Sequence, residues 1–315
     1  MKNKRLFIFL LTVSLCAMFT LTVCADTGPK PSVNIKFENL GDELCYATLL
    51  SERESTGPAS AWDGVEAHAN HNGNPDYSWS NLSYEIWKAF VDYKDSDGYY
   101  YLQETWQINE SKQLNWTYYP PSPFKILLYF PESNSFAVSD IYERYAFDSY
   151  FTVDMSGFDI NSVEYDEKQS NDIRYKEWRK ELVAHESYEI ASELFGLFVR
   201  IVLTVLIEIL IALAFGFREK KQLLFILIVN AVTQIVLNVL LNIINYNLGG
   251  LMMAICYVLF EIAVFVLEAL IYSAFINKVS IKPKKIWLCV LYAFIANVSS
   301  FALGAAIATF LPEVF

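Results

Sequence analysis

Four long apolar segments in the C-terminal part of the chain constrain its fold more than any other feature. They cover residues 194–216, 223–246, 251–275 and 286–311. About 20 apolar residues in a helix cross the hydrocarbon core of a bilayer, and a helix satisfies its own backbone hydrogen bonds in lipid. We therefore predict that residues 194–315 form an all-α bundle of four transmembrane helices.

The residues before this bundle have the pattern of a β-rich domain. Short runs of alternating apolar and polar residues, separated by turn-forming residues, continue from Asp26 to about Gly157. The expected strands cover residues 33–37, 44–50, 99–108, 114–119, 124–130, 136–139 and 149–153. Residues 84–93 instead have the spacing of a short helix. We predict a mainly-β, sandwich-like domain over residues 26–160, so that the fold class of the whole chain is mixed.

Two further segments flank the predicted domain. Residues 1–25 have the pattern of a secretory signal peptide, with basic residues first, an apolar run over 6–23 and small residues before the cleavage point. An uncleaved anchor is the alternative, because that run approaches spanning length. Residues 161–193 are expected to form a polar linker and then a juxtamembrane helical stalk.

Charge is distributed unevenly along the chain. Residues 26–193 contain 30 acidic and 13 basic residues. An acidic surface repels the phosphates of nucleic acids and the anionic headgroups of lipids, so we expect no nucleic-acid partner. The expected partners are the lipid bilayer and either another membrane or surface protein or a second copy of this chain.

Basic residues in the membrane region indicate its orientation. Lysine and arginine occur in the loops over 217–221 and 277–285, whereas the loop over 247–250 carries no charge. Basic loops stay on the cytoplasmic side of a membrane. We therefore predict a multi-pass plasma-membrane protein whose N-terminal domain and C-terminus are both extracellular.

Amide side chains recur at helical spacing in the second apolar segment. They are Asn230, Gln234, Asn238 and Asn242. An amide facing lipid would lack hydrogen-bond partners, so this stripe should face the bundle interior. Two interpretations are open: hydrogen bonds that hold the helices together, or a polar path or ligand site.

Acidic residues inside the apolar segments are a stronger signal, because an acid costs about 2.5 kcal/mol or more at the bilayer centre. These are Glu208, Glu261 and Glu268. Glu208 and Glu268 are at similar depths, and two carboxylates brought together there would share a proton. Arg200 is too shallow to neutralise them and could extend outward or bond to Asn238 or Asn242. Proton coupling, cation binding, recognition of a membrane partner and a purely structural role are all open.

Signals for metals, cofactors and catalysis are weak. Asp95, Asp97 and Glu104 resemble part of a calcium loop, but Tyr93 stands where the first acidic ligand belongs, so a turn is the simpler reading. No phosphate-binding, zinc-protease or nucleophile-elbow motif is present. Tyrosine and tryptophan side chains in the β-rich half could form a sugar-binding platform, although strand cores use the same residues. We expect no cofactor, no metal and no catalytic residue.

Six short segments, spread over nearly the whole chain, carry a family resemblance. They are ADTGPKPSV from Ala25, YATLLS from Tyr46, STGP from Ser55, YERYAFDSYF from Tyr142, EILIALAFGFR from Glu208 and QIVLN from Gln234. Together they resemble a family of membrane proteins from clostridial and related Gram-positive gut bacteria. This resemblance implies a Gram-positive plasma membrane with no outer membrane over the N-terminal domain, and it implies no particular activity.

The organisation of the chain favours a non-enzymatic surface protein that binds a ligand or partner through its extracellular domain. The alternative is a transporter or transporter subunit that uses the intramembrane acidic and amide residues. Four spans are few for a pore, so transport would require a dimer or another subunit. A second alternative is a membrane enzyme acting on lipid or wall precursors, for which the sequence offers no recognisable nucleophile or metal set.

Overall fold

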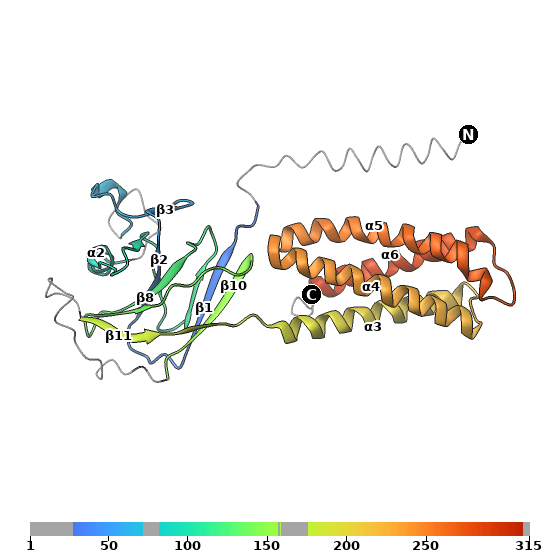
Figure 1. Cartoon of the computed structure of the whole chain (residues 1–315), viewed down its shortest axis with the longest axis horizontal. Coiled ribbons are helices and arrows are strands. Elements are labelled where there is room, and N and C mark those ends of the chain that lie inside the picture. Colours follow the sequence, from blue (N-terminus) through green and yellow to red (C-terminus); the bar gives the residue numbers. More distant parts are fainter. Residues whose placement is uncertain (1–27, 72–81, 157, 159–175, 311–315) are drawn as a thin grey trace.

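The computed structural model describes residues 28–71, 82–156, 158 and 176–310. It has a β-rich domain at one end and four long helices at the other (Figure 1). This arrangement confirms the mixed fold class. The predicted signal peptide lies outside the described residues.

Two facing sheets form the β domain. The strands are β1 (Ser32–Glu38), β2 (Tyr46–Ser51), β3 (Ser55–Thr56), β4 (Ala59–Ser60), β5 (Tyr100–Tyr101), β6 (Trp106–Gln107), β7 (Gln113–Trp116), β8 (Phe124–Phe130), β9 (Ser135–Ser139), β10 (Asp148–Asp154), β11 (Lys176–Leu182) and β12 (Ala184–Glu186). One sheet has the order β12-β10-β1-β7, and the other has the order β11-β9-β8-β2-β5, with β6 also paired to β2. The β1–β10 and β9–β11 pairs are parallel, and β3 and β4 form a small separate hairpin.

Alternation in strand β1 explains how the two sheets pack. Val33, Ile35 and Phe37 are buried, whereas Glu38 faces away from the core. The buried side chains join one hydrophobic core with residues of the opposite sheet, such as Leu128. Period-two alternation therefore places one face of each sheet in a shared interior.

Strand β8 is buried on both faces, because helix α2 (Tyr84–Asp92) covers the side away from the shared core. Leu127 and Tyr129 of β8 pack there with Trp87 and Phe90 of the helix. Ser83 caps the helix by accepting a hydrogen bond from the backbone N–H of Ile86 at 3.4 Å. The helix predicted in this region is confirmed, and it forms a third layer.

The strand predicted over residues 99–108 is interrupted at Gln103. This residue is buried and has a φ of 62°. Its Oε1 accepts hydrogen bonds from the Asn70 backbone N–H and from Trp87 Nε1, and its Nε2 donates to two backbone carbonyls. The left-handed backbone at Gln103 interrupts the strand and divides it into β5 and β6. This conformation is held because the buried Gln103 amide bonds to polar groups from three separate segments of the chain.

The stalk helix predicted within residues 161–193 is wrong over residues 176–186. Residues 176–186 form strands β11 and β12 instead, one in each sheet. Leu182 and Ala184 enter the hydrophobic core. Strands β9 and β10 would otherwise expose unpaired backbone groups at the sheet edges, and this segment pairs with them. The two sheets thus include residues beyond 160, the end predicted for the domain.

Four helices follow: α3 (Ile190–Ala214), α4 (Lys220–Leu248), α5 (Gly250–Phe275) and α6 (Ile286–Phe310). Each helix packs against the next, and α6 packs against α3, so the bundle is closed (Figure 1). All four are long and apolar enough to cross a membrane, and their outward faces expose apolar side chains. The predicted all-α bundle of four helices is confirmed, and its helices make this a multi-pass membrane protein.

The β domain contacts the bundle at a second place besides its covalent connection to α3. The backbone N–H of Phe147 donates to the carbonyl oxygen of Tyr246 at 2.9 Å. Gly249, at the α4–α5 turn, has a φ of +81°, and a Cβ there would lie 2.5 Å from the Phe147 ring. The rings of Tyr145 and Tyr188 also pack against Tyr246. Two attachments therefore fix the domain on the bundle.

The two loops at the opposite end of the bundle are also joined. The Glu219 carboxylate accepts hydrogen bonds from the backbone N–H groups of Ile281 and Lys282, at 2.6 and 3.1 Å. Gln222 Nε2 donates to Ser280 Oγ at 2.7 Å. Because Glu219 also caps helix α4, one residue orders both loops.

Candidate functional site

Three of the four amide residues of helix α4 lie in the bundle interior. Asn230, Gln234 and Asn238 are buried, whereas Asn242 is half-buried. Asn230 Oδ1 accepts a hydrogen bond from the Tyr272 hydroxyl of α5 at 3.1 Å. Asn238 Nδ2 instead donates to the Gln234 carbonyl oxygen of its own helix at 2.8 Å. Hydrogen bonding between helices therefore accounts for the Asn230 end of the stripe.

All three glutamates also lie in the interior. Glu208 of α3 and Glu268 of α5 are fully buried, and Glu261 is 8% exposed. Glu208 lies six residues before the end of α3 and Glu268 seven before the end of α5. At 1.5 Å per residue, each is about 10 Å from the loop end of its helix. The carboxyl groups interact electrostatically, so the structure brings these residues together at one depth.

Helices α4 and α6 supply polar partners for both carboxyl groups. Asn297 Nδ2 donates to Glu268 Oε2 at 2.8 Å, and Thr233 Oγ1 donates to Glu268 Oε1 at 2.7 Å. Ser300 Oγ donates to Glu208 Oε1 at 3.5 Å. All four helices therefore contribute to one buried acidic cluster, which we define as Glu208, Glu261, Glu268 and these hydroxyl and amide partners.

Two buried tyrosines close the acidic cluster on its loop side. The rings of Tyr272 and Tyr292 lie 5.4 Å apart. The Tyr292 hydroxyl donates to the Glu208 carbonyl oxygen at 3.4 Å, and Phe217 packs on the Tyr292 ring at 5.2 Å. Aromatic side chains thus separate the carboxyl groups from the basic loops.

Basic side chains lie away from the acidic cluster. Across the described ranges, the ion pairs all lie in the β domain. Arg200 is half-buried, donates from Nε to the Gly196 carbonyl oxygen at 3.3 Å, and interacts electrostatically with Tyr257 and Glu193. Three acids sharing a low-dielectric interior require protons or a bound cation, since several adjacent carboxylates are not stable there.

Several residues in or beside the acidic cluster were not singled out from the sequence: Thr233, Tyr272, Tyr292, Asn297 and Ser300. Tyr272 follows Glu268 by four residues, so helical spacing from the acids could have found it. Asn297 and Ser300 are polar residues in a mostly apolar span, three residues apart. That spacing was a usable signal for a polar face on the fourth helix.

The carboxylates of the weak calcium candidate bind a lysine. Lys125 Nζ lies 3.0 Å from both carboxylate oxygens of Asp95 and 2.5 Å from Asp97 Oδ2. Asp95 also accepts the backbone N–H groups of a turn. Glu104 is half-buried, and burial raises the pKa of its carboxyl. Among the described residues, no three His, Cys, Asp or Glu side chains are grouped to hold a metal ion.

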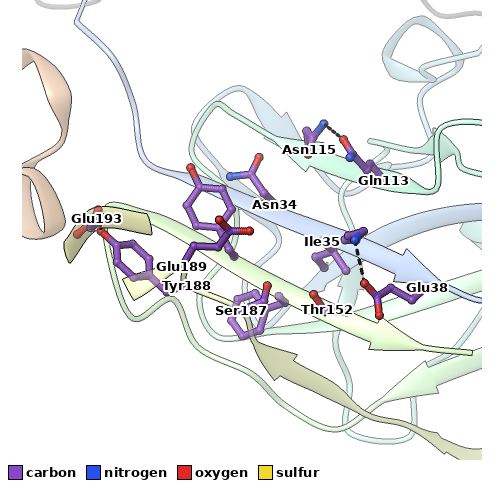
Figure 2. Close-up of a pocket in the computed structure, with 13 residues that line it drawn as sticks. Asn34, Ile35, Glu38, Gln113, Asn115, Thr152, Ser187, Tyr188, Glu189 and Glu193 are labelled. Atoms are coloured by element: carbon purple, nitrogen blue, oxygen red, sulfur yellow. Dashed lines mark hydrogen bonds and ion pairs between the residues drawn. The ribbon is translucent and has the colours of Figure 1, made fainter. Parts of the chain in front are cut away.

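A polar groove of about 820 Å³ lies on the outer face of the four-stranded sheet, where the chain enters α3 (Figure 2). Amide, carboxylate and tyrosine side chains line it: Asn34, Gln113, Asn115, Glu38, Glu189, Glu193, Tyr150 and Tyr188. Lys36 also lines the groove, but its Nζ is paired with Glu38 at 2.8 Å. The groove therefore suits neutral or cationic ligands better than anions.

Comparison of the chain with protein-family models, with curated proteins and with solved structures found no match. The resemblance to membrane proteins of Gram-positive gut bacteria therefore stays a prediction. What the protein does has to be inferred from the geometry of the polar groove and of the acidic cluster.

Proposed function

We propose that the protein is a surface protein of a Gram-positive plasma membrane that binds a ligand outside the cell through its β domain. The basic loops over 217–221 and 277–285 lie at the end of the bundle opposite the β domain. Positively charged loops remain in the cytoplasm, which supports an extracellular β domain. Helix α6 ends on the domain side, which supports an extracellular C-terminus as well.

The polar groove is the observation that carries this proposal. Asn34 reaches it from the sheet, and Tyr188 and Glu193 reach it from the segment that enters the first span (Figure 2). Tyr150 of β10 also lines the groove. A ligand bound there contacts the domain and the start of α3 together. An exposed tyrosine ring beside amide and carboxylate groups suits a neutral, hydroxyl-rich ligand such as a wall glycan.

Binding to the purified full-length protein in lipid nanodiscs tests this function. We expect neutral wall glycans to bind and acidic wall polymers not to bind. Tyr150→Ala should weaken binding at least tenfold. Tyr100→Ala is the matched control, because Tyr100 is 39% exposed, Tyr150 is 42% exposed, and Tyr100 lies outside the groove. Absence of glycan binding, or equal binding by both variants, would contradict the proposal.

The contact between Phe147 and the α4–α5 turn supports transmission of the bound state to the bundle. Gly249→Ala should break this contact, because an alanine is strained at φ +81° and its Cβ would overlap the Phe147 ring. Gly250→Ala is the control, since the nearest atom to its Cβ would be 3.8 Å away. Hydrogen exchange of the Phe147 amide should accelerate in the first variant and stay unchanged in the second. Equal exchange in both would argue against the coupling.

The acidic cluster favours transport as a second candidate function. Glu208 Oε2 and Gln234 Nε2 are buried without a hydrogen-bond partner among the described residues, which suits an interior that exchanges protons or a cation. Glu208→Gln and Glu268→Gln should leave membrane insertion intact and reduce ion or proton flux in proteoliposomes. Flux that is unchanged in both single variants and in the double variant would limit these acids to a structural role.

A further inference from the structure

A small cleft opens between helices α5 and α6 on the outside of the bundle. Its volume is about 180 Å³, and most of its lining is apolar: Val258, Ile262, Phe265, Phe294, Val298 and Phe301. Val258, Ile262 and Val298 are about half exposed on the bundle surface, so the cleft opens toward lipid. Cavities of this size with aliphatic and aromatic walls accept small apolar molecules such as benzene.

Two aromatic pairs bridge the helices on either side of the cleft. The rings of Tyr257 and Phe301 stack at 5.2 Å, and those of Phe265 and Phe294 meet edge to face at 5.6 Å. Tyr257 and Phe265 lie four residues before and four residues after Glu261 on α5. The carboxyl group of Glu261 is therefore framed by aromatic rings on both sides.

The remaining lining residues of the cleft, Glu261 and Asn297, are polar and at least nine-tenths buried. Glu261 Oε2 and Asn297 Oδ1 have no hydrogen-bond partner within the described residues. The amide nitrogen of Asn297 is already bonded to Glu268, and its carbonyl oxygen can only accept hydrogen bonds. Two unpaired acceptors in an apolar cleft favour a ligand with N–H donors. A positive charge on that ligand would neutralise the Glu261 carboxylate.

We propose that this cleft binds a lipophilic organic ammonium that enters from the bilayer. The ammonium group would pair with Glu261 Oε2 and Asn297 Oδ1, and the aromatic rings would stabilise its charge. Glu261 lies eleven residues into a helix of 26, so the site is deep in the hydrocarbon. This depth favours a small alkylamine over a phospholipid, whose headgroup stays at the interface. The cleft is also too small for a partner helix.

Equilibrium binding of radiolabelled decylammonium to the full-length protein in lipid nanodiscs tests the proposal. We expect saturable binding that decan-1-ol, with the same chain and no charge, does not compete. Glu261→Gln should weaken binding at least tenfold, because it keeps the shape of the side chain and removes the charge. Equal affinity in wild type and Glu261→Gln would overturn the proposal, as would effective competition by decan-1-ol.

A second pair of variants keeps the test decisive if Glu261→Gln does not fold. Val298→Trp should fill the cleft without altering Glu261 and should abolish binding. Val239→Trp is the matched control on helix α4, because Val239 is 45% exposed and Val298 is 49% exposed. Binding that survives Val298→Trp, or that is lost equally in both variants, would overturn the proposal.

The absence of decylammonium binding to the wild-type protein would also overturn the proposal. It would favour a basic side chain of a membrane partner as the occupant of the cleft. This inference is independent of ligand binding by the β domain.

Discussion

Both halves of the molecule bury carboxyl groups, but they neutralise them differently. In the β domain, the Asp95 side chain is fully buried and is paired with Lys125, which is itself 4% exposed. In the bundle, Glu208 and Glu268 are equally buried, and their bonds go to hydroxyl and amide groups. The β domain thus uses a counter-charge, and the bundle uses neutral hydrogen-bonding groups.

The solvent around each half explains this difference. A domain in water can bury one ion pair within a large core, and the attraction in a low dielectric offsets part of the desolvation. A lysine in the membrane interior would add its own cost of about 2.5–3.5 kcal/mol, whereas a proton neutralises a carboxylate without any new side chain. We therefore expect that removing a buried charged group strongly lowers the stability of the β domain, whereas removing a buried carboxyl group lowers the stability of the bundle only slightly.

The largest expected effect is that of Lys125→Met. This change leaves the buried Asp95 carboxylate without its cation and should lower the free energy of unfolding by about 3–5 kcal/mol. Urea unfolding of the β domain, followed by tryptophan fluorescence, measures it. Lys36→Met is the control, because Lys36 is 59% exposed and a solvent-exposed ion pair contributes little to stability. Equal losses in the two variants would show that the Lys125 pair is not a buried one.

A smaller effect is expected from Glu268 variants in the bundle. Glu268→Leu removes the acceptor for Thr233 and Asn297, and two such contacts are worth about 1 kcal/mol together. Glu268→Gln keeps an acceptor and should cost less than that. Thermal unfolding in detergent micelles measures both. A loss of about 3 kcal/mol or more for Glu268→Gln would mean that the native carboxyl is ionised and balanced by a cation, and the comparison between the two halves would fail.

The smallest effect is expected from Glu104→Gln, which replaces a half-buried carboxyl of the β domain. Burial raises the pKa of this group, so the folded state holds the proton more tightly than the unfolded state does. Stability is then lost as the pH rises from the unfolded pKa through the folded pKa. Glu104→Gln should remove this loss and stabilise the domain at pH 7 by less than about 1 kcal/mol. A variant that changes unfolding free energy equally at pH 4 and pH 7 would contradict this.

The membrane half could be predicted from the sequence to within a few residues, because length and hydropathy alone define a span. The similar depth of Glu208 and Glu268 could be counted along the two helices, but their meeting could not be predicted, because it depends on how α3 and α5 are rotated within the bundle. The roles of Asn297 and Ser300 depend in the same way on the rotation of α6.

The β domain was harder to predict because strand pairing joins distant residues. Lys125 is thirty residues from Asp95, and nothing local relates the two. The segment over 176–186 has helical spacing in isolation, and the open edges of β9 and β10 decide its structure. Tertiary pairing overrides local propensity at such edges.

The position of strands β11 and β12 has a consequence for biosynthesis. The last strand ends at Glu186 and helix α3 begins at Ile190. In the orientation proposed above, with the β domain outside the cell, the strands that complete both sheets would be the last part of the domain to leave the translocation channel. One edge of each sheet, at β9 and at β10, would then stay open until the first span is about to insert. Completion of the fold and entry into the bilayer are then nearly simultaneous events. A delay at that span would leave an exported chain with two unprotected edges, which is when an extracellular chaperone or protease would act on it.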